Sequence, residues 1–141
     1  MIATVERYEF VVEGEPKAKG RPRFTKSGIA YTPKETATYE NFVKVSFQNA
    51  YPIHVRMEGS IKATIIAYFG IPKSKPKKFK EQAEHEKVYP EKKPDCDNIA
   101  KTILDSLNGI AYEDDKQITD MLVLKRYSYI PRVEVILEPA L

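Results

Sequence analysis

The sequence predicts one α/β (α+β) domain, in which a mixed β-sheet is packed by two main helices. Several segments alternate apolar and polar residues with the period of a strand, and two others show the spacing of a helix. At 141 residues, the chain has the usual length of one domain and can bury about two thirds of its unfolded surface. Residues 1–141 are therefore expected to fold as a single unit.

A strand and a basic arm are predicted near the N-terminus. Tyr8, Phe10 and Val12 have the period of two of a half-buried strand, which Gly14 ends. Prolines and a glycine exclude a helix over residues 16–23, and the bases there are spaced two apart, so that they can point the same way. These bases are Lys17, Lys19, Arg21 and Arg23. The arm suits contacts with phosphate groups, although a charged surface loop has the same composition.

A helix and a long strand follow the arm. Thr32 is a candidate N-cap, Pro33 suits the first helical position, and Glu35 has capping-box spacing. The helix is expected to continue to residues 51–52, where a proline follows. Its predicted core-facing residues are Tyr39, Phe42, Val43, Phe47 and Ala50. Alternating apolar residues over 60–71 then predict a long, mostly buried strand.

Residues 72–94 are predicted to be a flexible loop. They hold four prolines, eight lysines and four glutamates with few apolar residues, and we expect one turn of helix around residues 79–86. We interpret the loop as a substrate-facing flap, because it leads directly into an acidic segment; a disordered excursion is the alternative. Its candidate lysines for contacts with a polyanionic substrate are Lys75, Lys77 and Lys78.

The acidic segment begins with a short predicted helix. Asp95 follows a proline in extended chain, so Asp95 and Asp97 are expected to face one side and Cys96 the other. Asp97 is then the predicted N-cap of a helix over residues 98–107. The buried face of this helix is predicted to be Ile99, Ile103, Leu104 and Leu107.

More charged residues follow along the acidic segment. Lys101 and Asp105 lie one turn apart on the predicted helix, and we interpret Asp105 as the helical partner of this lysine. Asn108-Gly109 ends the helix, and a loop then returns the chain to Asp114 and Asp115. The carboxylates of these two residues can thereby meet those of the first aspartate pair.

The chain ends in a predicted β-hairpin. Residues 118–125 and 133–138 both alternate, with a turn around residues 128–131. The predicted order is thus strand, helix, strand, helix, strand, strand. This order favours a mixed sheet over a repeat protein or a parallel barrel, and the sequence has no glycine-rich phosphate loop.

The clustered acids predict a metal site. Aspartates that lie together repel one another unless a cation joins them, and hard Mg²⁺ or Mn²⁺ suits carboxylate oxygens. Such an ion can activate a water molecule and stabilise the leaving oxygen of a phosphodiester, while Lys101 stabilises the developing phosphate charge. Each acid alone also has a structural explanation, as a cap, a turn residue or an ion-pair partner. Their clustering favours a metal-dependent nuclease.

Composition limits the other function classes. The net charge is +3, but residues 14–34 hold six bases and one acid, whereas residues 94–120 hold seven acids and two bases. A polyanionic substrate explains both patches, and so do two solvated surfaces of opposite sign. There is no apolar run of about 18 residues and no signal-peptide pattern, so a cytoplasmic protein without membrane association is expected. The lone Cys96 is expected to be a packed thiol, and the spacings fit neither an EF-hand nor a zinc site.

Three motifs together resemble the RusA family of Holliday-junction resolvases. They are Pro-Asp-Cys-Asp-Asn at residues 94–98, Leu-Asp-Ser-Leu-Asn-Gly at residues 104–109 and Tyr-Glu-Asp-Asp-Lys-Gln-Ile at residues 112–118, with Lys101 between the first two. The basic arm followed by Tyr31-Thr32 is similar to the family's N-terminal region. Residues 72–94 carry no motif of the family.

The resemblance implies a RusA-like fold and a homodimeric, Mg²⁺-dependent endonuclease, often of prophage origin, that acts in recombination and repair. Its substrate would be four-way junction DNA, cut by paired symmetric nicks. The resemblance places catalytic, metal-binding residues at Asp95, Asp97 and Asp115, a catalytic lysine at Lys101 and an auxiliary ligand at Asp114. Two other hypotheses are a non-catalytic DNA-binding or architectural protein, and a metal-dependent transferase, which the missing glycine loop disfavours.

Overall fold

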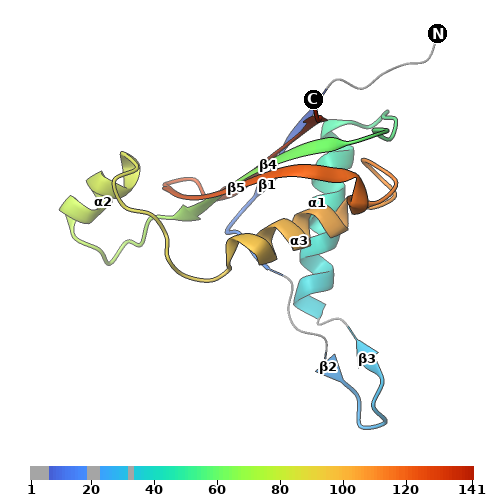
Figure 1. Ribbon diagram of the computed structural model, residues 1–141. Coiled ribbons are helices and arrows are strands. Elements are labelled where there is room, and N and C mark those ends of the chain that lie inside the picture. Colours follow the sequence, from blue (N-terminus) through green and yellow to red (C-terminus); the bar gives the residue numbers. More distant parts are fainter. Residues whose placement is uncertain (1–6, 19–22, 32–33) are drawn as a thin grey trace.

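The computed structural model describes residues 7–18, 23–31 and 34–141. Within them, a four-stranded mixed sheet packs against two helices, and a small hairpin and a third helix extend away from it (Figure 1). The predicted fold class, a mixed sheet packed by two main helices, is confirmed.

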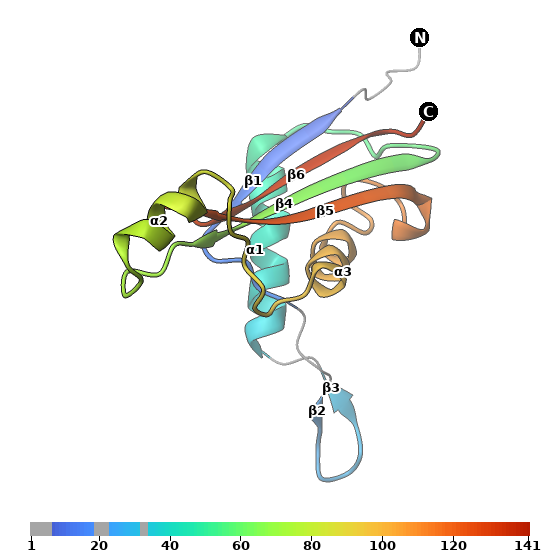
Figure 2. The same ribbon diagram turned by 60° about the vertical axis from the view of Figure 1, so that its left-hand side comes forward.

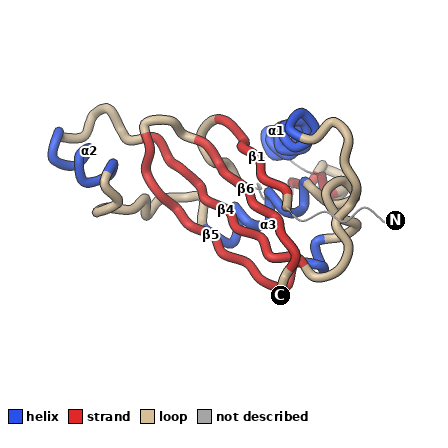
Figure 3. The backbone as a smooth tube through the Cα atoms, turned by 90° about the horizontal axis from the view of Figure 1, so that it is seen from above, coloured by secondary structure: helices blue, strands red, loops and turns tan. Residues whose placement is uncertain are grey.

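The sheet has the strand order β1-β6-β4-β5, which Figure 3 shows from above. Its strands are β1 (Tyr8–Glu13), β6 (Arg132–Pro139), β4 (Ile61–Gly70) and β5 (Ile118–Ser128). Only β4 and β5 are parallel, and in their register Ile65 lies beside Val123. The other neighbours are antiparallel, with Ile65 beside Val135. β1 and β5 are therefore the two edge strands, and the predicted strands are confirmed. The predicted terminal hairpin is wrong, because β4 lies between β5 and β6 and pairs with both of them. Alternation indicates that a segment is a strand, but it does not identify the strand's partner.

One face of the sheet is buried by the helices α1 (Lys34–Ala50) and α3 (Cys96–Ser106). Alternate residues of β1, β4 and β6 are buried there, as the period of two predicts. The predicted buried face of α3 is confirmed, because Ile99, Ile103, Leu104 and Leu107 all lie in the core.

The predicted core stripe of α1 is partly wrong. Tyr39, Val43 and Phe47 are buried, one turn apart, but Phe42 is 43% exposed and Ala50 is also exposed. The reason is that α1 contacts the sheet only through the narrow row of Tyr39, Val43 and Phe47, so residues on either side of this row face solvent. The predicted cap, Thr32-Pro33, lies outside the described residues.

Two short elements extend from this layer (Figure 2). The hairpin of β2 (Arg23–Phe24) and β3 (Ala30–Tyr31) was not predicted; its turn is closed by Gly28, whose amide donates to Thr25. The helix α2 (Lys77–Glu84) lies within residues 72–94 and begins two residues before the predicted turn of helix. The flexibility of this segment stays a prediction.

Candidate active site

The helix α3 begins one residue after Asp95. Asp95 is the N-cap residue in an extended conformation, with φ −75° and ψ 158°, and Cys96 is already helical. The prediction that Asp97 caps the helix is therefore wrong: Asp97 lies in the first turn. Asp95 and Asp97 are not related by strand alternation, because only Asp95 is extended. Both are exposed at the positive end of the helix dipole, which favours carboxylates.

Cys96 is exposed, so the predicted packed thiol is wrong. It precedes the apolar stripe of α3, which begins at Ile99, and therefore has no core to face.

Three charged residues follow the same side of α3. Asp97, Lys101 and Asp105 are spaced four apart, so they lie one above the other on the helix. Lys101, in the middle, is exposed. At 1.5 Å per residue, Asp97 and Asp105 are about 12 Å apart along the helix axis. The helix therefore presents an acid, a base and a second acid in a row.

Asp105 belongs to a carboxylate cluster at the end of α3, instead of serving only as the helical partner of Lys101. Its side chain is hydrogen-bonded to that of Asp115. Burial raises the pKa of Asp115, and the hydrogen bond to Asp105 together with the charges of Asp105 and Asp114 raises it further. A hydrogen bond between two carboxyl groups requires a proton on one of them. We call Asp105, Asp114 and Asp115 the C-terminal cluster, and Asp95 with Asp97 the N-terminal pair.

The loop that returns the chain to Asp115 is anchored beneath the cluster. Tyr112 is fully buried, and its hydroxyl donates to the carbonyl of Leu104 on α3. Gly109 has φ +75°, a conformation that favours glycine and turns the chain after the helix. The side chain of Asn108 then accepts a hydrogen bond of 2.8 Å from the amide of Asp115. These contacts fix Asp115 beside Asp105.

Gln117 holds the loop before β5 in place, a role that was not predicted from the sequence. Its Oε1 accepts from the amides of Glu113 and Asp114, at 3.0 and 3.2 Å. Its Nε2 donates to the carbonyls of Met57 and Gly59. The signal was present, because Asp114 and Gln117 have capping-box spacing for the short 3₁₀ helix Asp115–Gln117. One oxygen of Asp114 accepts from Lys116 as part of this cap.

The predicted metal ligands thus fall into two groups at opposite ends of α3. Within the described part of the chain, no group of three or more His, Cys, Asp or Glu side chains is gathered so that it could hold a metal ion. The donor chemistry nevertheless fits a hard cation, because the C-terminal cluster brings carboxylates together that repel one another when ionised. The structure brings Asp114 and Asp115 together, and leaves the N-terminal pair apart from them.

The described start of the predicted basic arm, residues 16–18, lies beside the N-terminal pair. The backbone of Lys17 hydrogen-bonds to the hydroxyl of Tyr39, which ties the arm to α1. A shallow depression beyond it is lined by Ala18, Lys93, Pro94, Asp95 and Asn98. Lys19 and Arg21 lie outside the described residues, and Arg23 begins β2.

The three predicted lysines of residues 72–94 lie at or just before α2. Lys75, Lys77 and Lys78 are all exposed. They are separated from the basic arm in sequence, but residues 72–94 end at the N-terminal pair.

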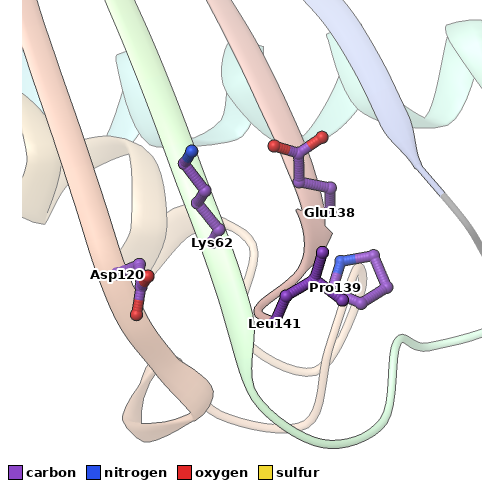
Figure 4. Close-up of a pocket in the computed structure, with 5 residues that line it drawn as sticks. All are labelled: Lys62, Asp120, Glu138, Pro139 and Leu141. Carbon is purple, nitrogen blue, oxygen red and sulfur yellow. The ribbon is translucent and has the colours of Figure 1, made fainter.

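A second depression lies away from all the predicted site residues. It is formed on the sheet by Lys62, Asp120, Glu138, Pro139 and Leu141. Figure 4 shows Lys62 on β4 between Asp120 on β5 and Glu138 on β6, which are its neighbours in the strand register. Its lining holds one base and two acids and none of the predicted site residues, and we assign it no part in the site.

The fold and the row of charged residues on α3 define a candidate phosphodiester-cleaving protein. The family model described as endodeoxyribonuclease RusA matches residues 13–138, so the chain belongs to the RusA family, whose members are endodeoxyribonucleases that act on branched DNA. The chain is also 37% identical over 134 residues to the uncharacterized protein YqaN of Bacillus subtilis (strain 168), which covers 92% of this chain and 94% of YqaN. The resemblance inferred from the three motifs is confirmed.

Among the helices of the described residues, none combines the length and the apolar character needed to cross a bilayer.

Proposed function

We propose that the protein is a Mg²⁺-dependent, structure-selective DNA endonuclease that resolves Holliday junctions by paired symmetric nicks in recombination and repair. The observation that carries the proposal is the row of Asp97, Lys101 and Asp105 on α3, with Asp115 bonded to its end, in a chain of the RusA family. Neither a DNA-binding protein without catalysis nor a structural protein needs carboxylates that repel one another beside an exposed lysine.

Asp95, Asp97 and Asp115 would hold Mg²⁺, with Asp114 as an auxiliary ligand and Mn²⁺ as a substitute. Carboxylate oxygens are the ligands that both ions prefer. When bound, the ion would supply an activated water and stabilise the leaving oxygen of the phosphodiester. Lys101, exposed between the two groups, would stabilise negative charge on the phosphate.

A homodimer would reconcile this ligand set with the geometry of one protomer. Two oxygens bound to one Mg²⁺ at about 2.1 Å are at most about 4.2 Å apart, much less than the roughly 12 Å between Asp97 and Asp105 along α3. We infer that a two-fold dimer pairs the N-terminal pair of one protomer with the C-terminal cluster of the other. Two such sites would also match the two symmetric strands of a junction.

DNA binding would come from two basic segments. One is the predicted arm with Lys17, Lys19, Arg21 and Arg23, whose described residue Ala18 lies beside Asp95. The other is the segment with Lys75, Lys77 and Lys78, which ends at the N-terminal pair. Lysine and arginine side chains neutralise phosphates and release counterions, so affinity is expected to fall with salt. Neither segment includes the carboxylates of the proposed site in its sequence, so binding and cleavage should be separable.

The substitution Asp97→Asn tests this separation. It removes a metal ligand and leaves the basic segments unchanged, so junction binding in a gel-shift assay should stay within about twofold. Cleavage in Mg²⁺ should fall on the order of 10²–10³-fold. Asp120→Asn is the matched control, because Asp120 is exposed on β5 and lies in the second depression.

If Asp97→Asn cleaves the junction at the rate of the control, the site assignment is wrong. If the wild-type protein binds junctions but cleaves none, the protein is instead a non-catalytic DNA-binding member of its family.

A further inference from the structure

Residues 72–94, which we call the α2 arm, leave the sheet after β4 and return at Asp95. Figure 1 shows α2 far from α3, with the chain between them passing the end of β5. Three consecutive residues of β5, Lys125, Arg126 and Tyr127, each contact a different part of the α2 arm. The arm is therefore held along β5, which is an edge strand.

The α2 arm holds this edge strand from both faces. The ring of Tyr127 packs edge-to-face on Phe79, with centroids 5.6 Å apart. The guanidinium of Arg126 lies 4.3 Å from the ring centroid of Tyr89 and 3.9 Å from a carboxylate oxygen of Glu86. Side chains of adjacent strand residues point to opposite faces, so the arm wraps around the edge of the sheet.

Lys125 makes the contact nearest to the carboxylates. Its ammonium donates a hydrogen bond of 2.5 Å to the backbone carbonyl of Lys92. The same ammonium lies 5.2 Å from the ring centroid of Phe69, a core residue that is 2% exposed. The ammonium of Lys92 lies 5.8 Å from that ring. Lys125 therefore connects a fixed point of the core to the end of the α2 arm.

The position of Lys92 limits that of Asp95. Only two residues separate them, and one is Pro94, whose ring restricts the backbone. Asp95 makes no side-chain capping bond, and its carbonyl accepts from Ile99 at 3.0 Å. The carboxylate of Asp95 is thus placed by the backbone on either side of it.

We propose that Lys125 is a positioning residue, which fixes Lys92 and thereby holds the carboxylate of Asp95 in the N-terminal pair. The inference rests on the proposed function only for its catalytic consequence. Lys125 does not reach the phosphate or the metal ligands itself: it acts through the backbone of residues 92–95. DNA contacts made by the α2 arm would then act on the carboxylates through the same link.

The first test measures backbone motion and needs neither DNA nor metal. In the wild type, the ¹⁵N relaxation order parameter of the Asp95 amide is expected near 0.85, and in Lys125→Met it should fall toward about 0.6. Lys125→Gln should lower the order parameter as Lys125→Met does, because the glutamine side chain is too short to reach the carbonyl of Lys92. Lys125→Arg should keep the wild-type order parameter. Lys62→Met, at the far end of β4, is the charge-matched control and should change nothing.

The second test measures single-turnover cleavage of a four-way junction by the full chain at saturating protein. Lys125→Met should be about 10- to 100-fold slower, because small displacements at a reacting centre cost that much. Its junction Kd should stay within about twofold of that of Lys62→Met, the charge-matched control outside the α2 arm, which should cleave the bound junction at the wild-type rate.

An unchanged order parameter at Asp95 in both Lys125→Met and Lys125→Gln would overturn the positioning role, whatever the activity. A mobile Asp95 with a normal cleavage rate would overturn its catalytic consequence. A mobile Asp95 in a protein whose wild type cleaves no junction would instead contradict the proposed function and support the positioning role.

Discussion

At the scale of residues, the chemistry depends on where single carboxylates lie relative to one another. Asp105 and Asp115 are hydrogen-bonded, and burial with two neighbouring acids raises the pKa of Asp115. The native state therefore binds a proton more tightly than the unfolded chain, in which an aspartate has a pKa of about 3.9. Stability accordingly falls as the pH rises from that value through the raised native pKa, and the whole penalty is present above it.

Replacing Asp115 by Asn should stabilise the metal-free protein at neutral pH. The gain is expected to be below about 1 kcal/mol, because the group is partly exposed and its repulsion is screened by solvent. Thermal unfolding in EDTA measures it, and the gain should vanish below a pH of about 4. Asp120→Asn is the control with the same change of charge. A lower Tm for Asp115→Asn at neutral pH would contradict the repulsion.

Residue types and spacing predicted part of this site. The motifs predicted Asp95, Asp97, Lys101 and Asp115 as site residues, which stays a prediction, and helical spacing put Lys101 one turn from Asp105. The contact of Asp105 with Asp115 was not predicted, because an ion pair with Lys101 on the same helix already explained the position of Asp105. The contact with Asp115 depends on the path of residues 108–114, which buried Tyr112 and Gln117 set through tertiary contacts. Local sequence patterns do not contain such contacts.

At the scale of elements, α1 is held to the sheet by a narrow aromatic contact. Phe47 is fully buried, and its ring centroid lies 5.1 Å from that of Tyr8 and 5.4 Å from that of Phe10, both edge-to-face. Tyr8 on β1 also contacts the segment between α1 and β4, because its hydroxyl donates a hydrogen bond to the carbonyl of Val55. The contact between α1 and β1 therefore depends on few side chains.

Phe47→Ala should lower the free energy of unfolding by about 3–5 kcal/mol, since it removes a buried ring and leaves a cavity. Val45→Ala, two residues away on the exposed side of α1, should cost less than about 0.5 kcal/mol. Urea unfolding followed by circular dichroism compares the two. Equal losses would show that α1 does not pack through the stripe of Tyr39, Val43 and Phe47.

Long periodic elements were predictable, and short ones were not. β1, β4 and β6 follow the period of two, and α3 follows its apolar stripe. The two-residue strands β2 and β3 have too few residues to show a period. The start of α3 differed by two residues because Asp95 and Asp97 are both acceptable caps, and only the backbone decides between them.

At the scale of the whole molecule, the separation of the two carboxylate groups predicts that a two-fold dimer, if the protein forms it as we propose, completes the active site. Asp97→Asn and Asp115→Asn should each be inactive alone. In an equal mixture that exchanges subunits, half of the dimers are mixed and hold one intact site, so about a quarter of the wild-type nicking rate should return. A mixture as inactive as its components would place all the ligands of one site within one protomer.

Local patterns did not give the strand order, and the pairing that they predicted for the last two strands is wrong. The predicted sequence of elements fits many sheets, and only the structure shows β6 between β1 and β4 with β5 at the edge. That order places the start of β5 beside the C-terminal cluster, and its later residues beside the end of the α2 arm. The site therefore depends on one strand that connects both ends of α3.

The most direct measurement of the central claim compares three labelled DNA substrates with the purified wild-type protein: a four-way junction, a linear duplex and a flap, each with and without Mg²⁺. A junction resolvase of this kind should make paired, symmetric nicks in the junction only when Mg²⁺ is present, and it should leave the duplex uncut. Binding of the junction without cleavage of any substrate in Mg²⁺ or Mn²⁺ would contradict the proposed function.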